Sequence, residues 1–269
     1  MASLFIILIT ILLIKLTFDF IFDLLQEGGL VVQNYRDQLI PSGYGLMFGL
    51  NLIVVLVVGS LIGIYESRIS TKILLLALTM TLIGIIDDTL GQRGFQGFKG
   101  HLKALLGEHK LTTGFLKMFF SFILVFYLFF TWYVKLTLAL TATLIVLLGA
   151  NFINLLDVRP GRALKVFIFL GSLIILNFTH DSLFLLPLLI MAVFFLPIDL
   201  KAQAMMGDVG SNILGAVLGF VFVINASEFG QLLVLLGLII INSYAEIHSF
   251  TEVIANNKLL NFIDHLGKH

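Results

Sequence analysis

The sequence contains no cysteine, which excludes disulfide bonds, thiolate zinc sites and a cysteine nucleophile and leaves the redox compartment undecided. Charged residues are also scarce, at 12% of the chain against about 25% in a typical soluble domain. Hydrophobic residues account for 59%, and the mean hydropathy is +1.08. Because the polar residues are too few to cover a globule, lipid is the expected solvent for most of this chain.

The formal net charge is zero, so the overall charge balance indicates neither a nucleic-acid partner nor an acidic one. The first residues, MASLFIILITILLIKLTF, lack a basic leading region and an A-x-A-like cleavage site. We interpret them as a retained first membrane span, and not as a signal peptide.

Nine apolar segments approach the length of about 20 residues that a spanning helix needs. They cover residues 3–22, 43–65, 71–87, 113–133, 136–156, 163–178, 182–199, 210–226 and 229–246. No strand alternation typical of a membrane barrel is visible, and lipid admits only helices or closed barrels. The sequence therefore predicts an all-α, polytopic transmembrane helical bundle of about nine spanning helices, without internal repeats or linkers.

The positive charges are distributed unevenly over the loops of this bundle. One alternate set of loops and adjoining helix ends carries twelve Lys and Arg residues, and the other set carries three. Positively charged loops are typical of the cytoplasmic side. We therefore expect a plasma-membrane protein with its N-terminus outside and its C-terminus in the cytoplasm.

The last residues differ from the spans. Residues 249–266 place apolar side chains at near-helical spacing with Asn, Lys and Asp between them. This pattern predicts an amphipathic helix that lies on the inner membrane surface or packs across the site. The chain is thus predicted to be a single membrane domain, with the bundle over 1–248 and a cytoplasmic tail over 249–269.

Three polar motifs end or begin spans on the predicted cytoplasmic side: GIIDD with Asp87 and Asp88, NFINLLD with Asp157, and MMGDVGS with Asp208. Acids at membrane depth are costly and are candidates for function. A cluster of carboxylates repels itself unless a cation lies among it, and Mg²⁺ is usually held by one or two carboxylates together with substrate phosphates. The motifs therefore predict a Mg²⁺-dependent site for phosphate chemistry at the boundary between lipid and water.

Structural roles compete with this interpretation. Asp199, at the end of the seventh segment, and Asp208 are each compatible with a helix cap or a solvated loop residue. For the pair Asp87–Asp88 capping is a poor account, because the C-terminal end of a helix disfavours negative charge. In NFINLLD the spacing places Asn151, Asn154 and Asp157 on one helix face, where hydrogen bonding between helices is the alternative for the two asparagines.

The ordered set GIIDD, NFINLLD and MMGDVGSNILGAVLG resembles the polyprenyl-phosphate N-acetylhexosamine-1-phosphate transferases, the MraY- and WecA-like members of glycosyltransferase family 4. The segment RDQLIPSGYGLMFG, residues 36–49, is similar to the entry of that family into its second span. The resemblance covers about residues 30–225. It implies transfer of a sugar-1-phosphate from a UDP-sugar to undecaprenyl phosphate with Mg²⁺ and release of UMP.

The resemblance also implies residue roles. Asp87 is then the base that deprotonates the lipid phosphate, Asp88 places metal or phosphate, and Asp208 binds Mg²⁺. Asp157 lies near the pyrophosphate, supported by Asn151 and Asn154. A list of further substrate-binding candidates comprises Lys99, Lys103, Arg159, Arg162, Lys165 and His248.

Several of these candidates have alternatives. Lys99, Lys103 and Lys110 either steer the anionic nucleotide or only set the topology. Where the family usually has NLTDGxDGLA, this chain has NLLDVRPGRALK, so its added positive charges either bind phosphate or accompany a changed or lost reaction. The family's His-rich loop before the last span is missing, and His248 near that place is also compatible with an interfacial helix end.

The sequence thus favours an integral-membrane sugar-phosphate transferase that initiates a cell-envelope glycopolymer, with polyprenyl phosphate and a UDP-sugar as partners. A homodimer is compatible with this interpretation. The second hypothesis is a non-catalytic homologue that binds lipid phosphate or partner proteins. A transporter is the third, but it predicts acids near mid-membrane, whereas the acids here gather at one face.

Overall fold

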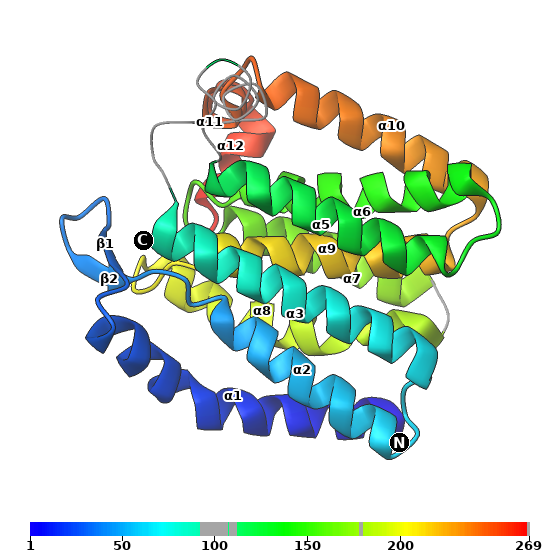
Figure 1. The fold of residues 1–269 in the computed structure, drawn as a ribbon. Helices are drawn as coiled ribbons and strands as arrows, with labels where there is room; N and C mark the ends of the chain where they lie inside the picture. Colours follow the sequence, from blue (N-terminus) through cyan, green and yellow to red (C-terminus); the bar gives the residue numbers. More distant parts are fainter. Residues whose placement is uncertain (92–106, 108–111, 178–179, 268–269) are drawn as a thin grey trace.

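The computed structural model describes residues 1–91, 107, 112–177 and 180–267. Within them the chain forms eleven α-helices, one 3₁₀ helix and one β-hairpin (Figure 1). The helices are α1 (Ala2–Glu27), α2 (Leu46–Leu61), α3 (Ser67–Leu90), α5 (Thr113–Phe130), α6 (Leu136–Leu156), α7 (Arg162–Asn177), η1 (His180–Leu185), α8 (Leu186–Leu200), α9 (Gly207–Asn225), α10 (Glu228–Ala245), α11 (Phe250–Asn256) and α12 (Lys258–His265). The strands β1 (Val31–Gln33) and β2 (Leu39–Pro41) pair antiparallel, with Val32 opposite Ile40.

The prediction of a polytopic helical membrane protein is confirmed. In the described part of the chain, seven helices are long and apolar enough to cross a membrane. Each of the nine expected segments coincides with a helix, that of 182–199 with η1 and α8 together, but α2 and α7 have only 16 residues each. The count of nine spans therefore stays a prediction. The β-hairpin between α1 and α2 was not predicted.

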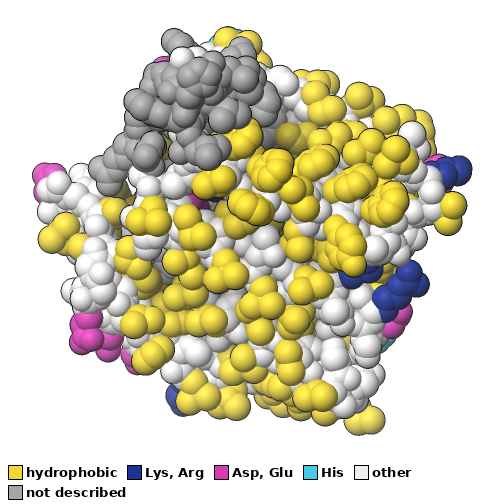
Figure 2. Space-filling view, in the orientation of Figure 1, with side chains coloured by type: hydrophobic (Ala, Val, Ile, Leu, Met, Phe, Trp, Pro, Cys, Tyr) yellow, Lys and Arg dark blue, Asp and Glu magenta, His cyan; other side chains and the backbone are white. Residues whose placement is uncertain are grey.

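The outer surface is apolar between two polar ends. Figure 2 shows hydrophobic side chains over most of the visible face, while Lys, Arg, Asp and Glu side chains gather toward its edges. Large exposed side chains on α1 and α10, such as Leu12, Leu16 and Leu236, contribute to this surface. In water such a surface would be unstable, so its natural environment is the hydrocarbon of a bilayer.

Helix α9 is the centre of the bundle, with α3 and α6 packed against it (Figure 1). Glycines allow the backbones to approach closely. A Cβ atom at Gly215 would lie 2.4 Å from the carbonyl oxygen of Gly149 in α6, and one at Gly84 in α3 would lie 2.4 Å from Cα of Val209. Small residues permit the same close packing in other membrane bundles, where van der Waals contact drives helix association.

The β-hairpin fixes the start of α9. The N–H of Met205 donates to the carbonyl of Pro41 at 2.8 Å, and the N–H of Tyr44 donates to the carbonyl of Met205 at 2.9 Å. Gly207 then begins α9 with φ of +72°, a left-handed conformation that glycine adopts without strain. These bonds hold the segment that leads into α9 beside the end of the hairpin.

Candidate functional site

Two carboxylates share one ammonium group where α3, α5 and α9 meet. Lys117, in the second turn of α5, donates to Oδ2 of Asp87 at 2.9 Å and also to Oδ2 of Asp208. Thr113 donates to the other oxygen of Asp87 at 3.3 Å. The side chains of Lys117 and Asp208 remain 19% and 27% exposed, so the group is accessible from the end of the bundle. One positive charge thus separates two negative charges at a partly open position.

Asp88 has a different role from its neighbour. Its Oδ1 accepts the N–H of Asp208 at 2.9 Å, and its Oδ2 accepts the N–H of Val209 at 3.2 Å. These N–H groups belong to the first turn of α9, which has no intrahelical acceptors for them and carries the positive end of the helix dipole. The sequence interpretation had discounted capping because it considered only the helix that contains Asp88. The structure shows that Asp88 caps a different helix.

Asp157 lies directly after α6 and outside the spanning segments. The backbone N–H of Gly207 donates to its carboxylate, and the carboxylates of Asp199, Asp208 and Asp88 are nearby. Burial, followed by the repulsion from these three groups, raises the pKa of Asp157 well above its usual range. An added positive charge at this place would therefore be stabilised by Asp157. The three motifs meet at one end of the bundle, as the sequence predicted.

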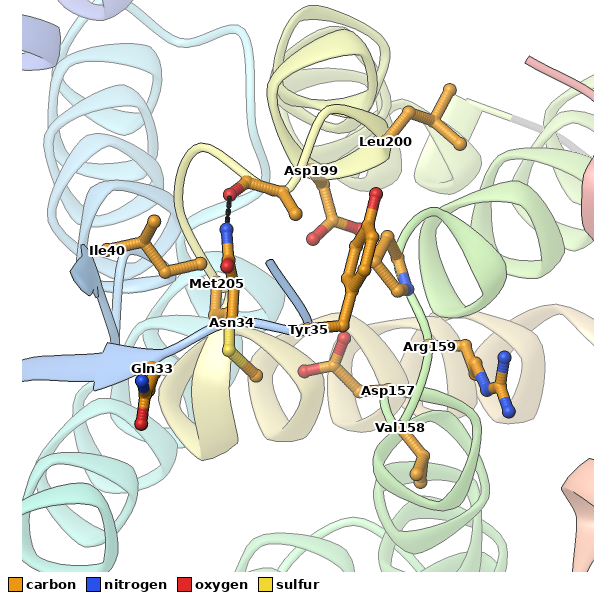
Figure 3. Close-up of a pocket in the computed structure, with 12 residues that line it drawn as sticks. Gln33, Asn34, Tyr35, Ile40, Asp157, Val158, Arg159, Asp199, Leu200 and Met205 are labelled. Atoms are coloured by element: carbon orange, nitrogen blue, oxygen red, sulfur yellow. Dashed lines mark hydrogen bonds between the residues drawn. The ribbon is translucent and has the colours of Figure 1, made fainter. Parts of the chain in front are cut away.

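A cavity of about 500 Å³ opens beside Asp157. Figure 3 shows Asp157, Asp199 and the ring of Tyr35 around one space, with Arg159 at its edge. Asp199 also accepts the N–H of Gly161 at 2.6 Å, which fixes the turn between α6 and α7. Asn34, in the hairpin, donates to the carbonyl of Ala202 at 3.0 Å. The cavity thus presents both acidic and basic groups, together with an aromatic ring.

The two asparagines of NFINLLD point to different helices. Asn154 accepts a hydrogen bond from Ser211 of α9 at 3.1 Å, one turn after Asp208. Asn151 donates to Oδ1 of Asn242 in α10 at 2.6 Å. Both contacts join helices, which is the alternative that the sequence left open for these side chains. Their substrate-binding role stays a prediction.

Two of the three basic residues that follow Asp157, Arg162 and Lys165, bind the tail. Arg162 donates through Nε and Nη2 to both oxygens of Asp264 in α12, at 2.8 and 3.2 Å. Lys165 donates to the carbonyl groups of Ile263 and Asp264 at 2.9 and 3.0 Å. These two of the donors that the sequence assigned to a substrate phosphate are thus directed to the protein itself. Phosphate binding by Arg162 or Lys165 stays a prediction that requires the tail to move.

The remaining candidates are His248 and the lysines between α3 and α5. His248 follows α10, is exposed, and stacks on Tyr244 with a centroid separation of 4.3 Å. Lys99, Lys103 and Lys110 lie outside the described residues.

Lys117 is the residue that the sequence interpretation missed as part of the site. It was counted only as a positive charge at a helix end. Its position inside the apolar run TTGFLKMFFSF was a signal, because a lysine so close to hydrocarbon usually has a specific anionic partner.

The metal ligands that the sequence predicts are Asp88 and Asp208. Within the described residues, no group of three or more His, Asp or Glu side chains converges as a metal site. Asp88, predicted to bind metal, uses both oxygens for the backbone of α9. Asp87 and Asp208 are the pair that a cation already bridges, the Lys117 ammonium. Two carboxylates suit Mg²⁺ when substrate phosphates complete its oxygen ligands, so this donor set fits a shared metal–phosphate site.

Comparison with known families agrees with the motifs. A family model described as Glycosyl transferase family 4 matches residues 70–226, which is more than half of the chain. The match includes Asp87, Lys117, Asp157 and Asp208 and leaves out the β-hairpin and the tail. No curated protein matches the chain.

Proposed function

Because the chain belongs to glycosyl transferase family 4, we propose that it transfers a sugar-1-phosphate from a UDP-sugar to polyprenyl phosphate, dependent on Mg²⁺. Family membership supports a polyprenyl-phosphate sugar-phosphate transferase in general. A UDP-N-acetylhexosamine is the proposed donor, and the reaction takes place at the cytoplasmic face of the plasma membrane. Its lipid-linked product initiates a cell-envelope glycopolymer.

The observation that carries this proposal is the contact of Asp87 and Asp208 with one lysine at the end of an apolar bundle. Such a place is reached by a lipid phosphate from the bilayer and by a nucleotide from water. Phosphoryl transfer depends mainly on positioning and on neutralising charge, and the site offers groups for both.

In the proposed reaction, an oxygen of the lipid phosphate attacks the phosphorus that carries the sugar. A new P–O–P bond forms, the bond to the UMP phosphate breaks, and UMP leaves with the electron pair. Asp87 accepts the proton of the lipid phosphate, while Lys117 orients the phosphate oxygens by its charge. The cavity at Asp157 and Arg159 receives the nucleotide part of the donor. Mg²⁺, when held by Asp87 and Asp208, supplies neutralisation of the pyrophosphate oxygens.

The test is exchange of labelled UMP into a UDP-sugar by purified protein in polyprenyl-phosphate vesicles. We expect exchange by the wild type and at least about a 100-fold loss in Asp87→Asn and Asp208→Asn, as is usual for a lost acid–base or electrostatic group. Asp181→Asn is the matched control, because Asp181 lies in η1, which precedes α8, while the site lies beyond the C-terminal end of α8. Unchanged exchange in both site variants would overturn the assignment. Absent wild-type exchange with retained binding of lipid phosphate would favour the non-catalytic homologue.

A further inference from the structure

The helix α12 is oriented with its polar side toward the protein. Asp264 is buried, whereas Leu259 and Phe262 are 67% and 66% exposed. Ile263 and Leu266 are exposed as well, and helical spacing places these four apolar residues on one face, opposite Asp264. An amphipathic helix that packs on a soluble protein has the reverse orientation, with its apolar face inward.

Ionic contacts fix this orientation. The guanidinium of Arg162 holds both oxygens of Asp264, and the two side chains are 6% and 7% exposed. Lys165 binds the last carbonyl groups of α12, where the helix dipole favours a positive charge. Rotating the apolar face inward would separate a buried ion pair, which is strongly unfavourable. The exposed apolar face is therefore a stable feature of the folded chain.

The helix that precedes the tail in the chain also exposes an apolar surface. Leu236 and Ile240 on α10 are exposed, and α10 has the hydropathy and length of a span with little of it buried. Ile247, between α10 and α11 in the chain, is 71% exposed as well. Both α11 and α12 lie at the end of the bundle that α10 reaches (Figure 1).

We propose that α12 lies in the surface of the bilayer, with Leu259, Phe262, Ile263 and Leu266 at the boundary between headgroups and acyl chains. Short amphipathic helices bind membranes in this way, and a nearby span keeps them at the interface. A second copy of the chain is a weaker occupant, since three side chains on an eight-residue helix and Leu266 directly after it fall far short of the roughly 800 Å² per partner in a stable protein interface. The occupant is therefore lipid.

Site-directed spin labelling tests the proposal directly, because the chain has no native cysteine that would need to be removed. Single substitutions Leu259→Cys, Phe262→Cys and Leu266→Cys report the apolar face. Lys258→Cys and His265→Cys are matched controls on the same helix. The full-length protein is labelled in vesicles of phosphatidylcholine and phosphatidylglycerol, and its thermal unfolding is compared with that of the unlabelled protein.

We expect labels at 259, 262 and 266 to be relaxed by dissolved oxygen more than by a water-soluble nickel chelate, and labels at 258 and 265 to show the opposite order. In detergent-free vesicles, higher nickel than oxygen accessibility at 259, 262 and 266 would overturn the proposal. Dipolar broadening between labels at 262, lost on dilution with unlabelled protein, would also overturn it, in favour of a second copy. Neither readout depends on transferase activity, so the proposed function and this inference can fail separately.

Discussion

The carboxylate of Asp88 accepts the backbone N–H of Asp208 at 2.9 Å, so a side chain at the end of α3 fixes the first turn of α9. The adjacent Asp87 instead binds Lys117 of α5. Two neighbouring residues of the same type therefore have separate tasks. Asp88 joins two helices, while Asp87 takes part in the group that remains accessible to a substrate.

Replacing Asp88 by Ala is expected to destabilise the protein, because it leaves the N–H groups of Asp208 and Val209 without their acceptor. Loss of an N-cap acceptor costs about 0.5–2 kcal/mol. Thermal unfolding in detergent measures the effect. Asp87→Asn is the comparison, and we expect it to abolish UMP exchange with a much smaller change in unfolding temperature. Equal unfolding temperatures for wild type and Asp88→Ala would show that the bonds from Asp88 to α9 do not stabilise the protein.

Replacing Lys117 by Gln is expected to increase the affinity for a divalent cation and to decrease UMP exchange. Without the ammonium, Asp87 and Asp208 repel each other and offer two free carboxylates to a divalent cation. In the absence of substrates we expect Mn²⁺ to bind about tenfold tighter, which corresponds to about 1.4 kcal/mol. UMP exchange should fall, because the phosphate loses its positive partner.

Titration of Mn²⁺ by electron paramagnetic resonance measures this affinity. The matched control is Lys135→Gln, since Lys135 is an exposed lysine before α6, at the other end of that helix from Asp157. The same Mn²⁺ affinity in Lys117→Gln and wild type would argue against a metal site at these two carboxylates.

The sequence predicted where the apolar helices lie because apolar runs of this length have few alternatives in lipid. It also predicted that Asp87, Asp157 and Asp208 lie at one end, because alternating topology places the ends of these helices on one side. The tail is helical as expected, although it forms two short helices.

Sequence patterns did not predict the contacts between residues that are far apart in the chain. Asp88 binds a backbone 120 residues away, and Arg162 binds Asp264 across 102 residues. A carboxylate has the same sequence signature whether it holds a metal, a lysine or a helix N-terminus, and only the packing of α3 on α9 distinguishes these roles. For the same reason, the basic residues of RPGRALK suggested a phosphate, whereas two of them, Arg162 and Lys165, bind the tail.

Stability should depend on pH through Asp157. Its folded-state pKa is raised by burial and by Asp199, Asp208 and Asp88, so the folded protein binds this proton more tightly than the unfolded chain. At pH values above the raised pKa, the ionised carboxylate of Asp157 therefore lowers the free energy of unfolding. This loss of stability disappears as the pH falls through the raised pKa toward the usual carboxyl range. We expect Asp157→Asn to be more stable than wild type at neutral pH, with the difference shrinking in acid. Unfolding temperatures measured across pH test this, and a difference independent of pH would contradict it.

Release of the tail is expected when its ion pair is broken. Asp264→Asn leaves Arg162 without its buried counter-charge, and loss of one partner of such a pair costs about 3–5 kcal/mol. We expect a protease to cleave within residues 249–266 much faster than in wild type while the bundle stays intact. Glu252→Gln, an exposed change in α11, is the control. Equal cleavage rates for Asp264→Asn and this control would mean that the ion pair does not hold the tail.

The close approach of α3 to α9 is expected to depend on Gly84. A Cβ there would lie 2.4 Å from Cα and 2.7 Å from N of Val209, and backbone atoms cannot yield as a flexible side chain does. Gly84→Ala should therefore push the two helices apart, lengthen the bonds from Asp88 to α9, and cost about 1–3 kcal/mol, as overpacked sites do. Since Asp208 moves with α9, UMP exchange should fall together with the unfolding temperature.

The matched control is Gly237→Ala in α10, where an added Cβ meets no atom within 4 Å. Alanine is favoured over glycine inside a helix by about 0.5–1 kcal/mol, so this variant should be as stable as wild type or more stable, with unchanged exchange. The contrast isolates helix separation from the general effect of adding a methyl group. If Gly84→Ala behaved like Gly237→Ala in both measurements, the contact between α3 and α9 would not be what holds Asp87 and Asp208 beside one lysine.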